Sequence, residues 1–311
     1  MQSRKPPKSC GFRAIKQNRN QRRQQLSRLR IGTAGIPLAA QPRTSCAGVE
    51  KLVELGLDCM ELEFVRSVQM QEQTARELRD VCEENQIELT VHAPYYINLN
   101  SKDPQKVEAS KARILKAARI GWLAGAKSVT FHAAYYHGDD HSVVFEKVKQ
   151  ELVQVRAILD DEGNSICLCP ETTGSSSQFG TVTEIVSLAL EIPGVYPCID
   201  FSHLHARSLG AMNSYEEFRR VIHLIGDKLG RSALEHLHMH LSGIEYGAKG
   251  ERKHLTLPES DMNYPAVLQV LADCDVSGWL ICESPNLEED ALLLKHEYTK
   301  ITNIKGGIHN G

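Results

Sequence analysis

The sequence contains no run of 18 or more apolar residues, so it offers no helical segment long enough to cross a bilayer. Its first residues lack the apolar stretch of a secretory signal, which argues against export. The nine cysteines include no Cys-x-x-Cys pair and follow no regular spacing. Such cysteines are typical of reduced thiols, so we expect a cytoplasmic protein without a disulfide framework.

Acidic residues are absent from residues 1–30, which hold ten of the 36 Lys and Arg residues. The same stretch is rich in Gln and Asn and poor in large apolar residues. This composition predicts a basic, disordered arm over residues 1–28. Such an arm could follow a polyanion such as nucleic acid, or it could be a solvated extension without a role in catalysis.

A glycine-rich dinucleotide loop is also missing, because the first strand closes in Gly-Thr-Ala-Gly at 32–35 and does not match G-x-G-x-x-G. A doubly wound open sheet is therefore disfavoured. Short apolar runs alternate instead with segments of helical periodicity, which predicts parallel strands joined by helices. Eight such strands are expected, over residues 29–35, 58–64, 87–93, 127–133, 165–171, 195–200, 235–242 and 278–284. Eight strand–helix units predict an α/β protein, a single-domain (β/α)₈ TIM barrel over residues 29–304, with a flexible tail over 305–311.

Barrel enzymes carry their chemistry at the carboxyl ends of the strands. Here the third to eighth predicted strands all end in residues able to bind a metal: His92, His132, Glu171, Asp200 with His203, His240, and Glu283. One histidine after a strand is more often held by a backbone hydrogen bond than by a metal, but six strand ends in register indicate a metal centre. Imidazoles with carboxylates suit zinc, or manganese or iron, better than magnesium. So many ligands imply more than one ion, and phosphodiester hydrolysis is the chemistry that suits such a centre best.

The strand-end segments resemble the motifs of endonuclease IV, the metal-dependent apurinic/apyrimidinic endonuclease family, within the xylose isomerase-like TIM barrels. The segments are VHAPYYINL (91–99), the histidine at 132, PET (170–172), CIDFSH (198–203), HMHLSG (238–243) and CESP (282–285). The resemblance spans about residues 29–300 and is that of a divergent branch. It implies a monomer with up to three zinc ions that cuts double-stranded DNA on the 5′ side of an abasic site in base excision repair.

The resemblance also implies roles for individual residues. His92 and His132 would hold the first zinc, and Glu171 would bridge it to the second. Asp200, His240 and Glu283 would complete the second site, with Glu283 also orienting the attacking hydroxide. Glu171 and Glu283 are thus the expected catalytic residues.

The third zinc would take His203 and a carboxylate–histidine pair from a later loop. The family carries Asp-x-His there, whereas this chain offers Glu251 and His254 with two residues between them. The alternative is a solvated run of charges in a loop. Two other histidines are not expected to bind metal: His238 should lie in the barrel interior behind His240, and the Asp-x-x-His spacing favours His203 over His205.

Three residues are expected to contact DNA by the same resemblance. Tyr95 matches an aromatic residue that enters the duplex beside a flipped nucleotide, and Tyr96 follows it as a wedge. Arg66, after the second strand, lies near the position of an arginine that enters the groove. The alternative is that both tyrosines only pack the mouth of the barrel.

Two other functions remain open from the sequence. A sugar isomerase or epimerase would use Glu171, Asp200, His240 and Glu283 to hold one divalent ion, but it would leave His92, His132, His203 and His254 without a role. A DNA-binding protein without catalysis would leave the whole ligand set as uncompensated buried charge.

Overall fold

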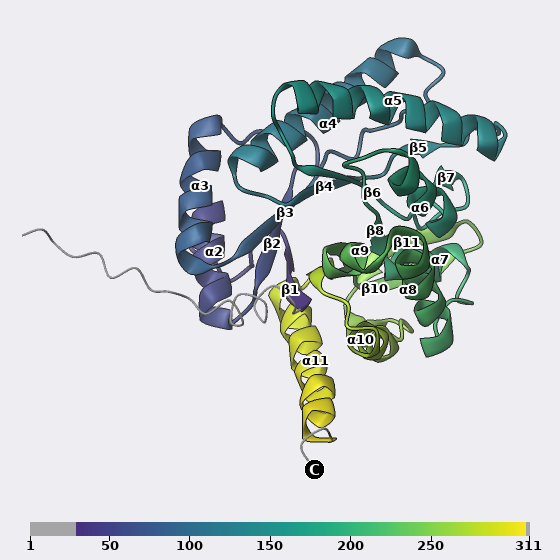
Figure 1. The fold of residues 1–311 in the computed structure, drawn as a ribbon. Coiled ribbons are helices and arrows are strands. Elements are labelled where there is room, and N and C mark those ends of the chain that lie inside the picture. The colour runs from purple at the N-terminus through teal and green to yellow at the C-terminus, as the bar shows by residue number, and fades with distance from the viewer. Residues whose placement is uncertain (1–28, 309–311) are drawn as a thin grey trace, which may run out of the picture.

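A computed structural model describes residues 29–308 of the chain (Figure 1). Its eight parallel strands form one sheet in the order β6-β4-β3-β2-β1-β12-β9-β8. Two isolated parallel bridges, Leu168 to Val195 and Glu171 to Cys198, connect the two ends of this order. The sheet therefore curves into a nearly closed barrel, and the predicted single-domain TIM barrel is confirmed. The barrel strands are β1 (Leu29–Ala34), β2 (Cys59–Glu63), β3 (Glu88–His92), β4 (Ser128–Phe131), β6 (Cys167–Pro170), β8 (Cys198–Asp200), β9 (Leu237–Leu241) and β12 (Gly278–Cys282).

Helices surround the strands on the outside (Figure 1). Several begin at a capping residue that the sequence supplies: the side chain of Asp103 accepts a hydrogen bond from the amide of Gln105, and Thr181 forms a capping box with Glu184. The helices are α2 (Ser45–Leu55), α3 (Glu72–Asn85), α4 (Pro104–Leu123), α5 (His141–Asp161), α6 (Val182–Glu191), α7 (Phe201–Arg207), α8 (Tyr215–Leu229), α9 (Arg231–Glu235), α10 (Tyr264–Asp273) and α11 (Glu288–Ile308), with a 3₁₀ turn at Leu257–Glu259. None of the helices in residues 29–308 is both long and apolar enough to cross a membrane.

The inside of the barrel is unusually polar. Along β9, Leu237, Met239 and Leu241 belong to the apolar core, whereas His238 and His240 alternate with them and point to Glu61 of β2. This alternation follows from the two-residue period of a strand, which sends successive side chains to opposite faces. A buried polar layer therefore lies directly beneath the carboxyl ends of the strands.

Two short antiparallel strand pairs stand above that rim. β5 (Ala134–Tyr135) pairs antiparallel with β7 (Gln178–Phe179), and β10 (Gly243–Gly247) pairs antiparallel with β11 (Gly250–Leu255). The second pair is an insertion between β9 and α10, and it packs against α7. It brings residues that are distant from any barrel strand to the rim.

Several boundaries differ from the sequence prediction. β6 begins at Cys167 rather than at 165, and β8 begins at Cys198 rather than at 195. α11 continues to Ile308, past the predicted end of the barrel domain at 304. The predicted arm over 1–28 lies outside the described residues.

Candidate metal centre

The six strand ends predicted to bind metal meet in one place. His92 ends β3, Asp200 ends β8 and His240 lies next to the end of β9. The other three residues, His132, Glu171 and Glu283, each come directly after or one residue past a barrel strand. Glu171, whose side chain is fully buried, belongs to two groups of candidate ligands and borders a third. They are the first group (His92, His132, Glu171), the central group (Glu171, Asp200, His240, Glu283) and the third or hairpin group (His203, Glu251, His254).

The two oxygens of Glu171 face different groups of residues. Its Oε2 lies 3.4 Å from Nε2 of His92 and 3.3 Å from Nε2 of His132. Its Oε1 lies 3.1 Å from Nδ1 of His240 and 3.2 Å from Nδ1 of His203. This is the arrangement that a carboxylate needs in order to bridge two ions.

Asp200 links two of the groups through the helix that it caps. Its Oδ1 accepts a 2.8 Å hydrogen bond from the backbone amide of His203, in the first turn of α7. Its Oδ2 lies 3.1 Å from Nδ1 of His203. Asp200 also forms a group with Glu171, His240 and Glu283, whose candidate ligand atoms all lie within 4.8 Å of one another. Asp200 also lies directly beside His240, because these two residues pair in the β8–β9 ladder.

The third group, His203 with Glu251 and His254, depends on an irregularity in the β10–β11 pair. The ladder pairs Glu245 with Lys253 and Tyr246 with Glu251, so Arg252 is an extra residue without a partner. Residues three apart in a regular strand point to opposite faces, but one bulged residue restores the same face. Glu251 consequently lies 3.2 Å from Nε2 of His203 and 3.4 Å from Nε2 of His254.

A close backbone approach holds this insertion against the loop after β6. The amide of Glu251 donates a 3.0 Å hydrogen bond to the carbonyl of Gly174. A Cβ atom on Gly174 would lie 2.6 Å from Oε2 of Glu251 and 2.7 Å from its Cβ, and a Cβ on Gly250 would lie 2.1 Å from the Gly174 carbonyl oxygen. Both glycines are needed for the approach that brings Glu251 to the rim.

Backbone carbonyls fix the orientation of three of the candidate histidine ligands. Nδ1 of His92, His203 and His254 lies 2.7, 2.9 and 3.1 Å from the carbonyl oxygens of Ala93, Thr172 and Glu283. A carbonyl oxygen only accepts, so each Nδ1 carries a proton, and each Nε2 is the nitrogen that faces a carboxylate of its group and could bind a metal there.

The buried charges compensate one another across the centre. Burial opposes ionisation of Glu171, yet the surrounding imidazoles of His240 and His132 hold its pKa well below the usual range. Burial likewise acts against the charged form of His92, but the contact with Glu171 raises its pKa to about 10. Burial raises the pKa of Asp200 to about 6. The carboxylates thus draw positive charge into the site.

Three buried carboxylate oxygens show that these residues fit divalent ions. Among residues 29–308, Oε2 of Glu171, Oδ2 of Asp200 and Oε2 of Glu283 have no hydrogen-bond partner. Buried oxygens of this kind are costly unless something compensates them. Ions in the two groups that contain Glu171 would do so, and the mixed imidazole and carboxylate donors suit zinc, manganese or iron.

The residues predicted to contact DNA lie beside the centre. Tyr95 and Tyr96 follow β3, and their side chains are 52% and 62% exposed. The ring of Tyr95 lies 5.3 Å from that of His92, and its amide donates to the carbonyl of Val65, next to the exposed Arg66. The tyrosines are therefore not buried packing residues, and all three predicted residues line the rim.

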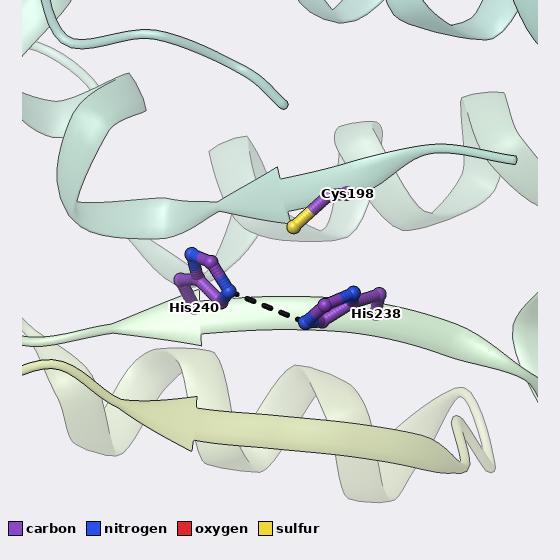
Figure 2. Close-up of side chains that lie close together, drawn as sticks. All are labelled: Cys198, His238 and His240. Carbon is purple, nitrogen blue, oxygen red and sulfur yellow. Dashed lines mark hydrogen bonds between the residues drawn. The ribbon is translucent and has the colours of Figure 1, made fainter. Parts of the chain in front are cut away.

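Two acidic residues near the centre could not be found from the ends of the third to eighth strands, because they lie on the second strand. Glu61 and Glu63 of β2 share a face and approach Glu283, and burial raises the pKa of Glu63 to about 8. The signal was present in the segment DCMELEF, where two acids alternate with apolar residues. Cys198 was also passed over, although Figure 2 shows its sulfur facing His238 and His240 across two neighbouring strands.

The two histidines set aside from the sequence lie apart from the three groups. His238 is fully inside the barrel, 2.9 Å from Oε2 of Glu61 and 3.0 Å from Oγ of Ser128. His205 faces Asp261, with Nε2 2.9 Å from the carboxylate, and its Nδ1 lies 3.2 Å from the carbonyl of Met212.

Together the fold and the rim define a (β/α)₈ barrel with a candidate multinuclear metal centre at the carboxyl ends of its strands. The family model described as a xylose isomerase-like TIM barrel matches residues 49–300. The chain belongs to this family. It is 42% identical over 271 residues to an uncharacterised protein of Methanocaldococcus jannaschii, a match that covers 87% of this chain and 97% of that protein.

The more distant similarities include both endonucleases and an epimerase-like protein. The chain is 24% identical over 204 residues to a probable endonuclease 4 of Mycoplasma genitalium, across 64% of this chain and 67% of that protein. Its fold is similar to a D-tagatose 3-epimerase-like protein (TM-score 0.69, 19% identity, 89% of this chain and 99% of the other). It is also similar to endonuclease IV from Thermus thermophilus (TM-score 0.66, 18% identity, 87% and 99%). The predicted resemblance to endonuclease IV, as a divergent branch of the family, is confirmed.

Proposed function

We propose that this protein is a metal-dependent endonuclease that hydrolyses the DNA phosphodiester 5′ to an abasic site. The observation that carries the proposal is the number of ligand groups. The central group could hold one ion by itself. Two further sets of ligands flank it: His92 with His132, and His203 with Glu251 and His254. Divalent ions held there would activate water and neutralise charge on the scissile phosphate.

The chain's own residues would divide the work around the phosphate. Glu171 would hold two neighbouring groups at a fixed separation, because each of its oxygens faces a different one. Glu283, partly open to solvent at the rim, would position the attacking water from the side of the central group. Rigid placement by six barrel strands would keep these groups aligned before the substrate arrives.

Tyr95, Tyr96 and Arg66 support a DNA substrate. Exposed aromatic rings beside a metal centre can stack on bases or fill the gap left by an extruded nucleotide. Tyr95 is within ring contact of His92, so a nucleotide displaced by it would have its phosphate close to the first group. Arg66 could contact the backbone from the adjoining loop.

A sugar epimerase or isomerase is the second candidate, and one observation favours it. The central group of Glu171, Asp200, His240 and Glu283 suffices to hold one divalent ion, and the fold is similar to that of a D-tagatose 3-epimerase-like protein. That activity assigns no role to the flanking histidines.

Parallel assays distinguish the two candidates. The pure protein, loaded with zinc or manganese, is incubated with a duplex that contains one abasic site and, separately, with ketohexoses. We expect a nick 5′ to the abasic site and no epimerisation, with the nick lost in Glu283→Gln and kept in His236→Gln, an exposed histidine at the opposite end of β9. Epimerisation without nicking would overturn the proposal.

A further inference from the structure

The ligand histidine His240 is oriented differently from the other candidate ligands. Backbone carbonyls hold His92, His203 and His254 through Nδ1, whereas His240 turns its Nδ1 toward the centre, 3.1 Å from Glu171 and 3.4 Å from Glu283. Its Nε2 therefore points down into the barrel. What it meets there decides which of its nitrogens is free for a metal.

Nε2 of His240 meets a buried carboxylate that the strand-end motifs do not include. Oε1 of Glu61 lies 3.0 Å from it, and Oε2 of Glu61 lies 2.9 Å from Nε2 of His238. Among the described residues, no other group hydrogen-bonds to Oε1, while Oε2 also accepts from the hydroxyl of Thr90 at 2.7 Å. All three side chains are buried to within 1% exposure, so Glu61 depends on these imidazoles for compensation of its charge.

The proton positions follow from these contacts. The two Nε2 atoms lie only 3.2 Å apart, and the carboxylate of Glu61 faces both (Figure 2 shows the two imidazoles). A carboxylate accepts only, so both Nε2 atoms carry hydrogen. For His238 this leaves Nδ1 to accept from the hydroxyl of Ser128 at 3.0 Å. For His240 it leaves Nδ1 as the nitrogen that faces the carboxylates of the central group, where an ion would take the place of the hydrogen that Nδ1 shares with Glu171.

We propose that Glu61, seated with His238 in the barrel interior, is a positioning residue that fixes His240 in the tautomer needed to bind a metal through Nδ1. The inference rests on the proposed metal centre but not on the substrate. Glu61 does for this ligand what a backbone carbonyl does for the other three. A carboxylate partner also makes the imidazole a stronger donor to the ion.

The first test needs no variant. In the full-length protein labelled with ¹⁵N-histidine and freed of metal by chelation, the imidazole nitrogen shifts report the tautomer of His240, assigned by comparison with His240→Gln. We expect Nε2 to stay protonated both before and after zinc is added, and Nδ1 to be the nitrogen that coordinates zinc. Coordination of zinc through Nε2, or an Nε2 without hydrogen in the zinc-loaded protein, would overturn the proposal.

The second test measures how much the contact between Glu61 and His240 contributes to zinc affinity. Zinc is titrated against a competing chelator into wild type, Glu61→Gln, Glu61→Leu and Thr130→Val. Glu61→Leu should weaken one zinc site by about 10–100-fold. The zinc affinity of Glu61→Gln should lie closer to wild type, because the amide carbonyl can still accept from Nε2 of His240. The amide NH₂ would then donate to His238, whose Nδ1 would donate to the Ser128 hydroxyl instead of accepting from it. Thr130→Val, a control in the same buried layer, should be unchanged.

Two outcomes would contradict the proposal. Equal zinc affinity in wild type and Glu61→Leu would make Glu61 a structural residue only. An additional zinc equivalent in wild type that is lost in Cys198→Ser would instead make Cys198, His238 and His240 a metal site of their own. A protein that passes both tests but does not nick DNA would refute the proposed function and leave the role of Glu61 intact.

Discussion

The central group and the hairpin group reach the same rim by different routes. Glu171, Asp200 and His240 have side chains with 0% exposure and lie at the ends of neighbouring barrel strands. Glu251 and His254 are 25% and 26% exposed and lie on the β10–β11 insertion, which depends on one bulge and one close backbone contact. The hydrogen bonds between the parallel barrel strands hold the central group in place. The hairpin group is held only by the strand register of the β10–β11 pair. The hairpin group should therefore be separable from the centre, and the central group should not.

The largest effect is expected from Glu171→Gln. An amide cannot bridge two groups with two anionic oxygens, so nicking should fall by several orders of magnitude while the protein stays folded. Metal content should fall at the first two groups, and the hairpin group should keep its ion. Cleavage assays, circular dichroism and metal analysis check this. Near-normal cleavage would refute the role of Glu171.

A smaller effect is expected from Glu251→Gln. The hairpin group should lose its ion because His203 and His254 alone are too few ligands, while the other ions stay bound. Removing one source of charge stabilisation should lower nicking by about 10²-fold. The matched control is Arg252→Gln, whose side chain is 63% exposed and lies at the bulge. Loss of all metal in Glu251→Gln would show that the two groups are not separable.

Gly174→Ala tests the backbone contact that supports the hairpin. The added methyl group would meet Glu251 at 2.6–2.7 Å, so the insertion must shift. The zinc affinity of the hairpin group should fall by about tenfold, because a contact that supports one of its ligands is lost. The zinc affinity of the central group should not change. Titration with zinc measures this, and Ser175→Ala serves as the neighbouring control. Unchanged affinity would mean that the contact does not position Glu251.

Deletion of Arg252 should have the smallest effect. Without the bulged residue, Glu251 and His254 become two apart in a regular strand and still share a face. The third ion should stay bound with little change in affinity. An alanine inserted after Arg252 should abolish that site instead. The reverse result in a zinc titration would show that the bulge does not explain the spacing.

The barrel could be predicted from the sequence because its signals are local and repeated. Each strand is a short apolar run, and the parallel strands of a barrel bring their carboxyl ends together regardless of the loops. The sequence alone could therefore group six residues at the strand ends: His92, His132, Glu171, Asp200, His240 and Glu283. Roles for these residues stay predictions.

The hairpin and the interior partner of His240 could not be predicted in the same way. A Glu-x-x-His spacing points to opposite faces of a regular strand, and only the observed bulge at Arg252 shows that this rule does not apply. Glu61 lies on a strand whose end carries no histidine. Its proposed role depends on contacts with two side chains that are nearly 180 residues away in the chain. Such contacts follow from barrel closure and not from any local pattern.

The number of metal ions per chain tests the central claim most directly. The purified full-length protein is saturated with zinc, freed of loosely bound ions and analysed for metal and protein. The three groups of ligands predict about three ions per wild-type chain and about two in Glu251→Gln. One ion per chain, unchanged in Glu251→Gln, would contradict the account and favour a single-metal sugar enzyme.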